Sequence, residues 1–215
     1  IQGPKSFKLM EKVFGKDINN LKFFKFDFFN FNKKKYLISR SGFSKQGGFE
    51  IHIDDVKAGL DLYDYFFEIG KDFNLKAGSP NLIERIEGGL LSYGNDMDIG
   101  DNPFECGFDK YVHLESDIVF LGKENLKKIK EKGIKKKLMG VKIDSTTISV
   151  NEGIPILDSD NNEIGELRSG AFSPRFKKIV GIAMVKKDFS NISQKFQIKL
   201  NDKLVSGEIS SLPIL

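Results

Sequence analysis

The last third of the chain is a series of short strand-like segments separated by turns. Apolar runs and alternating apolar and polar residues predict strands at 138–144, 154–157, 163–168, 179–186, 195–200 and 203–209. Residues 158–162, between two of these strands, have the composition of a hairpin tip. Repeated strands at this spacing favour a small antiparallel barrel or sandwich, and we expect the domain boundary to lie between about residues 118 and 134.

Two helices are expected in the first 70 residues. Pro4 suits a first helical position and precedes an apolar stripe made of Phe7, Met10, Val13 and Phe14. Asp54 or Asp55 can cap a second helix that runs to Gly70. Its apolar residues at helical spacing are Val56, Leu60, Tyr63 and Phe67.

Strands are expected between these helices, at 22–31, 36–40 and 49–53. Strands covered on one side by two helices predict an α+β layer domain. A lysine-rich helix at about 123–132 then leads into the strand-rich part of the chain.

A further helix is predicted after Ser79 and Pro80, which suit a cap and a first-turn position. Its apolar stripe consists of Leu82, Ile83, Ile86 and Leu90. Gly88 and Gly89 fall inside this pattern, where each glycine costs about 1 kcal/mol relative to alanine. We therefore expect these glycines to admit a close neighbour.

Composition limits the classes of function. The 215 residues carry 34 Lys and Arg against 30 Asp and Glu, a net charge of +4 that is spread along the chain. Such a balance tolerates a small anionic ligand and does not favour nucleic acid. The single cysteine, Cys106, excludes an internal disulfide and a multi-cysteine metal site. With no apolar run of membrane-spanning length, we expect a soluble, cytoplasmic protein without membrane partners.

The segment 40–53 offers the best candidate for a binding residue. Phe49, Ile51 and Ile53 share one face of a strand, which leaves Glu50 and His52 on the other, beside a glycine-rich turn. A carboxylate presents two acceptors that complement a planar group with two parallel N–H donors, such as a guanidinium or the edge of a pterin. The alternative is a solvated strand face on which Glu50 pairs with a lysine.

Other motifs point to no particular chemistry. The chain has neither a phosphate-binding loop nor a dinucleotide glycine fingerprint, and residues 158–169 lack the Gly and Glu of a calcium loop. His52 and His113 lack the spacing of metal ligands, so no metal is expected. The lysines at 127–128 and 135–137 fit a solvated face, or a surface for an anionic polyglutamate tail or an acidic partner.

A set of ordered motifs resembles the glycine-cleavage T-protein (aminomethyltransferase) family over nearly the whole chain. The motifs are Ile1-Gln2-Gly3-Pro4-Lys5, Gly47-Gly48-Phe49-Glu50, Arg85-Ile86-Glu87-Gly88-Gly89, Tyr93-Gly94-Asn95-Asp96, Pro103-Phe104-Glu105-Cys106-Gly107, Phe120-Leu121-Gly122-Lys123-Glu124 and Ser169-Gly170-Ala171-Phe172-Ser173-Pro174. Within the family, the amino-acid sequence of residues 40–48 and 81–96 is most similar to that of the dimethylsulfoniopropionate demethylases. The resemblance implies a folate-binding domain at 1–118 that lacks its N-terminal part, a connecting helix at 119–133 and a C-terminal β-barrel at 134–215.

The resemblance also implies a cofactor and site residues. It places tetrahydrofolate in a central channel, with Glu50 holding the pterin edge and Arg85 and Tyr93 near the folate. Phe43 and His52 fall where the demethylases surround the sulfonium substrate. Those enzymes carry Trp at the Phe43 position and an aromatic residue at the His52 position, so the cation cage is weaker here.

Family members carry a segment before the Gln2-Gly3-Pro4 motif, and it includes the aspartate that aminomethyltransferases use near folate N5. The sequence is therefore expected to be an N-terminally truncated fragment, inactive alone, whose catalytic residue lies outside it. For the parent protein the resemblance implies methyl transfer from dimethylsulfoniopropionate to tetrahydrofolate. The alternatives are a glycine-cleavage aminomethyltransferase, with a lipoyl carrier protein as partner, and a non-catalytic folate-binding protein. The oligomeric state stays open, with a homodimer as one alternative.

Overall fold

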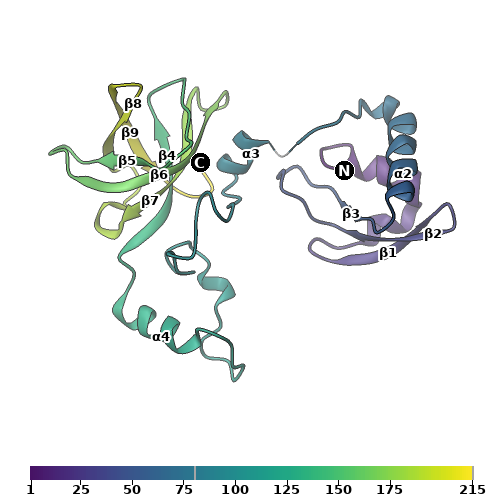
Figure 1. Cartoon of the computed structure of the whole chain (residues 1–215), viewed down its shortest axis with the longest axis horizontal. Coiled ribbons are helices and arrows are strands. Elements are labelled where there is room, and N and C mark those ends of the chain that lie inside the picture. Colours follow the sequence, from purple (N-terminus) through teal and green to yellow (C-terminus); the bar gives the residue numbers. More distant parts are fainter. Residues whose placement is uncertain (80, 215) are drawn as a thin grey trace. The chain divides into compact units, whose positions relative to one another are not determined.

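The computed structural model describes residues 1–79 and 81–214, which form two compact units, Ile1–Asn81 and Leu82–Leu215. Unit 1 contains two helices and a small sheet, and unit 2 contains the strand-rich part (Figure 1). The predicted α+β class with a C-terminal barrel is confirmed. Each unit is described by itself below.

Unit 1 is built on an antiparallel sheet of order β1-β2-β3. The strands are β1 (Phe26–Phe31), β2 (Lys34–Ser39) and β3 (Glu50–His52). Asn32 and Lys33 join the first two strands with positive φ angles of 47° and 63°, the conformation that a tight hairpin requires. The helices are α1 (Ser6–Phe14) and α2 (Val56–Ile69), each followed by a short 3-10 helix, η1 (Lys16–Asn20) and η2 (Gly70–Phe73).

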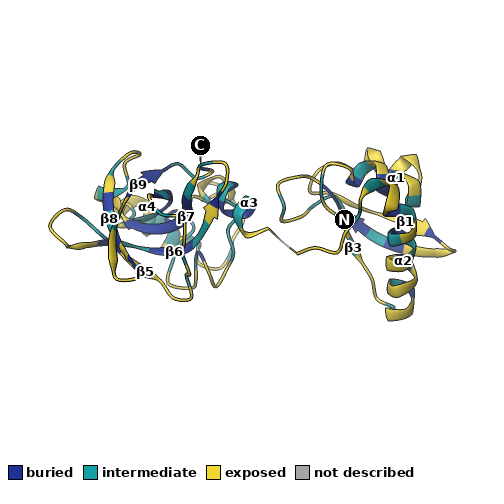
Figure 2. Ribbon diagram, turned by 90° about the horizontal axis from the view of Figure 1, so that it is seen from above, coloured by how far each residue is buried: buried dark blue, intermediate teal, exposed yellow. Residues whose placement is uncertain are grey.

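The helix α2 packs through a different face from the one predicted. Asp55 caps it as expected, because its carboxylate accepts a hydrogen bond from the Ala58 amide at 3.0 Å. The core of unit 1, however, takes up the stripe of Ala58, Leu62 and Phe66. Val56 is 82% exposed and Leu60 is 60% exposed, so the predicted stripe lies mostly on the outside. Figure 2 shows exposed and buried residues alternating along this helix.

Unit 2 contains a closed barrel of order β4-β7-β6-β5-β8-β9 in which all pairs are antiparallel. Its strands are β4 (Lys136–Ile143), β5 (Ile154–Leu157), β6 (Glu163–Ser173), β7 (Lys178–Lys186), β8 (Lys195–Leu200) and β9 (Lys203–Ser210). The remaining elements are α3 (Leu82–Glu87), α4 (Lys123–Lys132), η3 (Asp109–Tyr111) and η4 (Lys187–Phe189). Of the two predicted architectures, the barrel is therefore the one that forms.

The strand β7 is buried on both sides. Ile179, Ala183 and Val185 fill the barrel interior. Val180, Ile182 and Met184 instead belong to a second cluster, which includes Ile86 of α3 and Cys106. This second cluster attaches α3 and the loops that follow it to the outer wall of the barrel.

The two glycines after α3 end the helix instead of lying inside it. Gly89 has φ +64°, its amide donates to Ile86 O (3.0 Å), and the Leu90 amide donates to Arg85 O (2.8 Å), which is the Schellman pattern. The expected close neighbour is present, because a Cβ on Gly89 would lie 3.0 Å from Leu212 Cγ. Pro80, the predicted first-turn residue of this helix, lies outside the described residues.

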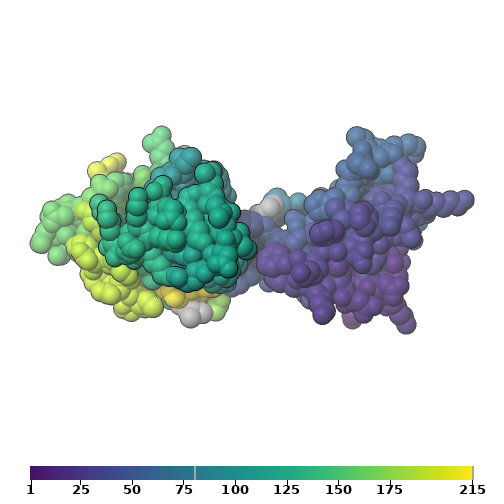
Figure 3. Space-filling model, turned by 90° about the horizontal axis from the view of Figure 1, so that it is seen from below, coloured from purple at the N-terminus to yellow at the C-terminus, as the bar shows by residue number. Residues whose placement is uncertain are grey.

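The region between α3 and β4 is mostly irregular, as predicted, and ends in α4. In the space-filling view its teal atoms cover the near face of unit 2 (Figure 3). No residue of α4 is buried. Within the described residues, no helix combines the length and apolar character that crossing a membrane requires.

Candidate functional site

Glu50 begins β3 on the exposed side of the sheet, while its neighbour Phe49 is fully buried. This is the alternation that the sequence predicts. The Glu50 carboxylate accepts a short hydrogen bond from the Ser41 hydroxyl. Among the described residues its contact is thus with a turn hydroxyl rather than with a lysine, while its exposure also fits the solvated strand face of the alternative interpretation. Because each carboxylate oxygen accepts two hydrogen bonds, Oε1 and one lone pair of Oε2 can still receive a forked donor.

The two predicted substrate residues, His52 and Phe43, lie close to Glu50 in the chain. His52 follows it on the same face of β3, where Nε2 lies 3.5 Å from Ser39 Oγ. Ser39 in turn contacts the Ser41 hydroxyl at 2.8 Å. Hydroxyl groups therefore connect His52 to Glu50. Phe43, in the preceding turn, is 37% exposed and available for a ligand contact.

Arg85 lies in unit 2, is 5% exposed and has its guanidinium engaged inside the protein. Its NH1 donates to Asp96 Oδ2 at 2.5 Å, and its NH2 donates to Ser169 Oγ at 2.8 Å. Asp96 Oδ2 also accepts from the Ser92 amide at 2.7 Å. Arg85 therefore holds the loop that carries Tyr93, and a role in folate binding would be exercised through that loop.

Tyr93 itself is 69% exposed, which leaves its ring available to a ligand. Glu87 lies two residues after Arg85 in α3 and has a different partner. Glu87 accepts instead from Ser173 Oγ at 2.6 Å. Arg85 and Glu87 thus attach α3 to two positions along the same barrel strand, β6.

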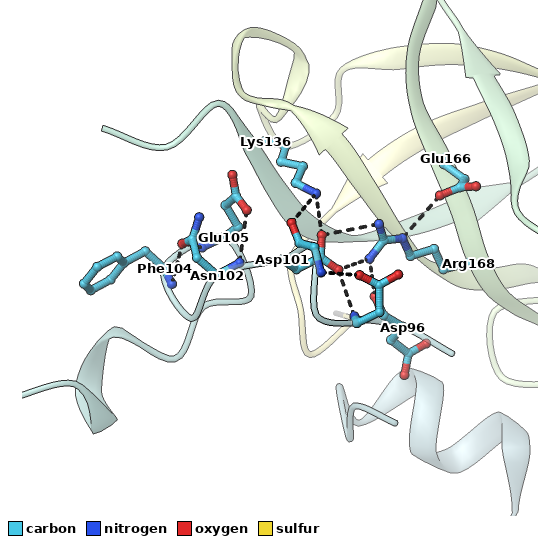
Figure 4. A network of polar contacts seen from close by, with 10 residues as sticks. Asp96, Asp101, Asn102, Phe104, Glu105, Lys136, Glu166 and Arg168 are labelled. Atoms are coloured by element: carbon cyan, nitrogen blue, oxygen red, sulfur yellow. Dashed lines mark hydrogen bonds and ion pairs between the residues drawn. The ribbon is translucent and has the colours of Figure 1, made fainter. Parts of the chain in front are cut away.

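A second charged group, centred on Asp101, fixes the same loop region to the barrel (Figure 4). Its Oδ2 accepts from Arg168 NH1 at 2.5 Å, and its Oδ1 accepts a short hydrogen bond from Lys136. Arg168 also donates to Asp96 O at 3.0 Å and to Glu166 at 3.3 Å. The strand β6 changes register between Leu167 and Ser169, so Arg168 is the extra residue of a β-bulge. Such a bulge redirects a side chain, here towards the loop.

The protonation of these buried groups follows from their neighbours. Burial by itself would raise the pKa of Asp101, but hydrogen bonds from Arg168 and Lys136 outweigh it and lower the pKa to about 2. Burial, together with the charges of Asp101 and Glu105, raises the pKa of Cys106 to about 11. Cys106 is therefore a neutral thiol at physiological pH, not a thiolate nucleophile.

Several contacts were not foreseen from the sequence. Ser41, Asp96 and Asp101 each bond a residue that is not a chain neighbour. Ser41 and Asp96 lie in stretches cited for the resemblance, 40–48 and 81–96, but their partners were not predicted. A hydroxyl in a turn gives no sequence signal for the carboxylate that it will meet. Among the described residues, no group of three or more His, Cys, Asp and Glu side chains could hold a metal ion.

Comparison with known proteins identifies the family to which this chain is related. The profile described as the GCVT N-terminal domain matches residues 1–116, and the glycine cleavage T-protein C-terminal barrel domain matches residues 136–215. Dimethylsulfoniopropionate demethylase DmdA of Ruegeria pomeroyi is 37% identical over 86% of this chain and 50% of its own length. The aminomethyltransferase of Thermoanaerobacter pseudethanolicus is 31% identical over 98% of this chain and 57% of its own length.

A solved structure agrees in fold. Aminomethyltransferase T of the glycine cleavage system from Bartonella henselae matches with a TM-score of 0.83 at 22% identity, covering 100% of this chain and 58% of that one. The chain thus spans between half and three fifths of the length of the relatives it matches. The two profile matches confirm the resemblance seen in the sequence. The chain belongs to the glycine-cleavage T-protein (aminomethyltransferase) family.

Proposed function

We propose that this chain is part of a tetrahydrofolate-dependent methyltransferase that moves a methyl group from the sulfonium of dimethylsulfoniopropionate to N5 of tetrahydrofolate. Aminomethyltransferases of the family use tetrahydrofolate. The observation that carries the finer assignment is the 37% identity to the demethylase of Ruegeria pomeroyi. The exposed Glu50 carboxylate supports folate binding, because it can accept the two parallel donors at a pterin edge.

The reaction needs little from acid–base groups. The lone pair of folate N5 attacks the methyl carbon while the carbon–sulfur bond breaks and its electron pair returns to sulfur. A neutral thioether leaves, and N5 gives up its proton to solvent. A sulfonium is already an activated leaving group, so the protein has to align nitrogen, carbon and sulfur and exclude water.

The residues of this chain would divide these tasks. Glu50 would hold the pterin, and Tyr93 would line the folate pocket on a loop fixed by Arg85. Phe43 would face the sulfonium, where a cation over an aromatic ring gains about 0.5–2 kcal/mol. His52 would border the same substrate from β3. The catalytic aspartate of the family has no counterpart among these assignments.

The second candidate is a glycine-cleavage aminomethyltransferase, which takes its carbon from a lipoyl carrier protein and forms methylenetetrahydrofolate. It is supported by relatives of that name that are 31–32% identical over 97–98% of the chain. That coverage exceeds the 86% matched by the demethylase. The exposed lysines of α4 would suit an acidic carrier under this alternative.

A folate-binding protein without catalysis is the third candidate. It would keep the scaffold and the Glu50 contact while turning over no donor. Its mark would be tight folate binding that neither donor converts into product.

The test offers each donor, together with tetrahydrofolate, to the complete product of the gene. Methylmercaptopropionate and 5-methyltetrahydrofolate are expected from dimethylsulfoniopropionate. Ammonia and methylenetetrahydrofolate from an aminomethyl-lipoyl carrier would instead establish the glycine-cleavage reaction. Folate binding without product from either donor would leave the non-catalytic candidate, and the absence of folate binding would overturn all three.

A further inference from the structure

The side chain of Gln2 reaches across to the turn that precedes β3. Its Nε2 donates to the carbonyl oxygens of Ser41 (2.9 Å) and Phe49 (3.3 Å). Its Oε1 accepts from Ser44 Oγ at 2.7 Å. One carboxamide therefore connects the beginning, the middle and the end of the turn formed by residues 41–49.

Backbone hydrogen bonds hold the main chain of Gln2 against the turn. The Gly3 amide donates to Gly47 O (3.0 Å), and the Phe49 amide donates to Ile1 O (2.9 Å). Gln2 and Gly48 form an antiparallel bridge between these two bonds. Because its backbone is held against the turn, the carboxamide loses little freedom when it makes its three contacts.

Two glycines in the turn make room for this side chain. A Cβ on Gly42 would lie 2.2 Å from Gln2 Nε2 and Oε1, closer than side-chain atoms can approach. A Cβ on Gly48 would lie 2.8 Å from the same carboxamide and 2.3 Å from Ile1 O. Both glycines have positive φ, +154° and +150°. The close approach of Gln2 thus explains the glycines at positions 42 and 48.

The contact of Gln2 with Ser41 connects Gln2 to Glu50, the candidate binding residue. Gln2 holds the carbonyl of Ser41, and the hydroxyl of Ser41 donates to the Glu50 carboxylate. Phe49, the second acceptor of Gln2, is the chain neighbour of Glu50. The carboxamide therefore restrains Glu50 in two ways: through Ser41, which donates a hydrogen bond to its carboxylate, and through Phe49, which precedes it in the chain.

We infer that Gln2 is a positioning residue for Glu50. Through Ser41 and Phe49 it fixes the turn so that the carboxylate is already oriented for a ligand with two parallel N–H donors. Binding then avoids the entropic cost of ordering the turn. The inference rests on the proposed folate site for the identity of the ligand, whereas the restraint on the turn is a property of the chain itself.

The first experiment tests the restraint without a ligand. Amide hydrogen exchange of residues 41–50 is measured in the 215-residue chain, in Gln2→Ala and in Gln194→Ala. Gln194 lies just before β8 in unit 2, and its side chain donates to the neighbouring Lys195 carbonyl at 3.4 Å. We expect Gln2→Ala to accelerate exchange in the turn about tenfold and Gln194→Ala to leave it unchanged. Unchanged exchange in Gln2→Ala would overturn the inference.

A double-variant cycle separates this pathway from general loosening. Ser44 Oγ donates to Gln2 Oε1, so if the carboxamide restrains the turn, the acceleration in Gln2→Ala/Ser44→Ala should be well below the product of the two single effects. Independent, multiplicative effects would show that the two residues act separately and would contradict the restraint by the carboxamide.

The final measurement concerns the ligand, in the complete gene product. Gln2→Ala should weaken tetrahydrofolate binding about tenfold, and Gln2→Asn, which keeps a shorter carboxamide, should recover part of it. A loosened turn with unchanged folate affinity would overturn the positioning role. If the unsubstituted protein binds no folate while Gln2→Ala still loosens the turn, the proposed function fails and the restraint by Gln2 stands.

Discussion

Asp101 keeps a full negative charge although only 1% of its side chain is exposed. Arg168 and Lys136 supply the compensating positive charges from two different barrel strands. A buried carboxylate without such partners would be neutral, because burial favours the uncharged form. The pair of cations thus makes the charge tolerable and, at the same time, fixes the loop before α4 to the barrel wall.

The first prediction concerns acid stability. The pKa of Asp101 is lowered from 3.8 to about 2 in the folded state. The stabilisation, about 2 kcal/mol, is therefore fully present above pH 4 and is lost as the pH falls towards 2. Asp101→Asn should lower the free energy of unfolding at pH 7, and its difference from the unsubstituted protein should shrink below pH 4. Urea unfolding between pH 7 and 3 measures this difference, with the exposed Asp109→Asn as control. A difference that does not change with pH would contradict the assignment.

The second prediction concerns the Glu50 carboxylate. Glu50→Gln keeps the shape but removes the charge and exchanges one acceptor for a donor, so it should weaken tetrahydrofolate binding about tenfold or more. The fold should be unaffected because the side chain is exposed. Calorimetry on the complete gene product tests this, and Asp54→Asn, which makes the same charge change just beyond β3, should bind as the unsubstituted protein does. Equal folate affinity in Glu50→Gln would remove Glu50 from the site.

At the scale of elements, α2 shows how a helix with apolar residues on several sides is oriented. Its sequence offers two stripes at helical spacing, one containing Leu60 and the other containing Leu62. The stripe of Leu62 is buried because Ala58 and Phe66 complete a surface that packs into the core of unit 1. Leu60 and its neighbours along the other stripe remain exposed.

The third prediction compares these two leucines. Leu62 is 1% exposed, so Leu62→Ala should destabilise the protein by about 2–5 kcal/mol through lost burial and a cavity. Leu60→Ala, the same substitution two residues earlier in the same helix, should change stability by less than about 0.5 kcal/mol. Chemical denaturation followed by circular dichroism measures both. Equal losses, or a greater loss at Leu60, would mean that the stripe predicted from the sequence is the buried one.

At the scale of the whole molecule, each unit has a core of its own. The aromatic-rich cluster of unit 1 lies within residues 1–75, and the barrel interior and its outer cluster lie within residues 86–214. Residues 76–79, near the C-terminal end of unit 1, are exposed. Segments with few buried contacts open most easily, so the junction is the expected site of local cleavage.

The fourth prediction follows from these separate cores. Trypsin at low concentration should cut first after Lys76 and release a stable fragment that begins near residue 77 and retains the barrel. Mass spectrometry of the early fragments identifies the cut, and Lys76→Ala should slow it. First cleavage inside the barrel strands would contradict the division into two units.

Much of the architecture could be predicted because it depends on local patterns. The six barrel strands, the aspartate cap of α2 and the termini of α4 were predicted within a few residues of where they lie. Each follows from hydrophobic periodicity or turn chemistry within a short window. β6 was predicted to end at 168 but continues to Ser173, because the bulge at Arg168 allows the strand to bend and go on pairing with β7.

The candidate site was likewise predicted only in part from the sequence. The sequence identified Glu50 as an exposed acid beside a glycine turn, since alternation along one strand decides which side chains face outwards. It did not reveal that Gln2 and Ser41 would support that acid, because both contacts join residues that are not neighbours in the chain.

By itself, the sequence determined that an α+β layer domain precedes a barrel, where the barrel strands lie, and to which family the chain belongs. These features depend on short periodic patterns and on motifs that follow one another in order along the chain. Only the tertiary structure decided which stripe of α2 is buried, that Arg85 pairs with Asp96 and that Asp101 joins Arg168 to Lys136. The physical reason is that a helix with two apolar stripes satisfies its local preferences either way. A buried charge likewise selects its partner by proximity in space, which no local pattern encodes.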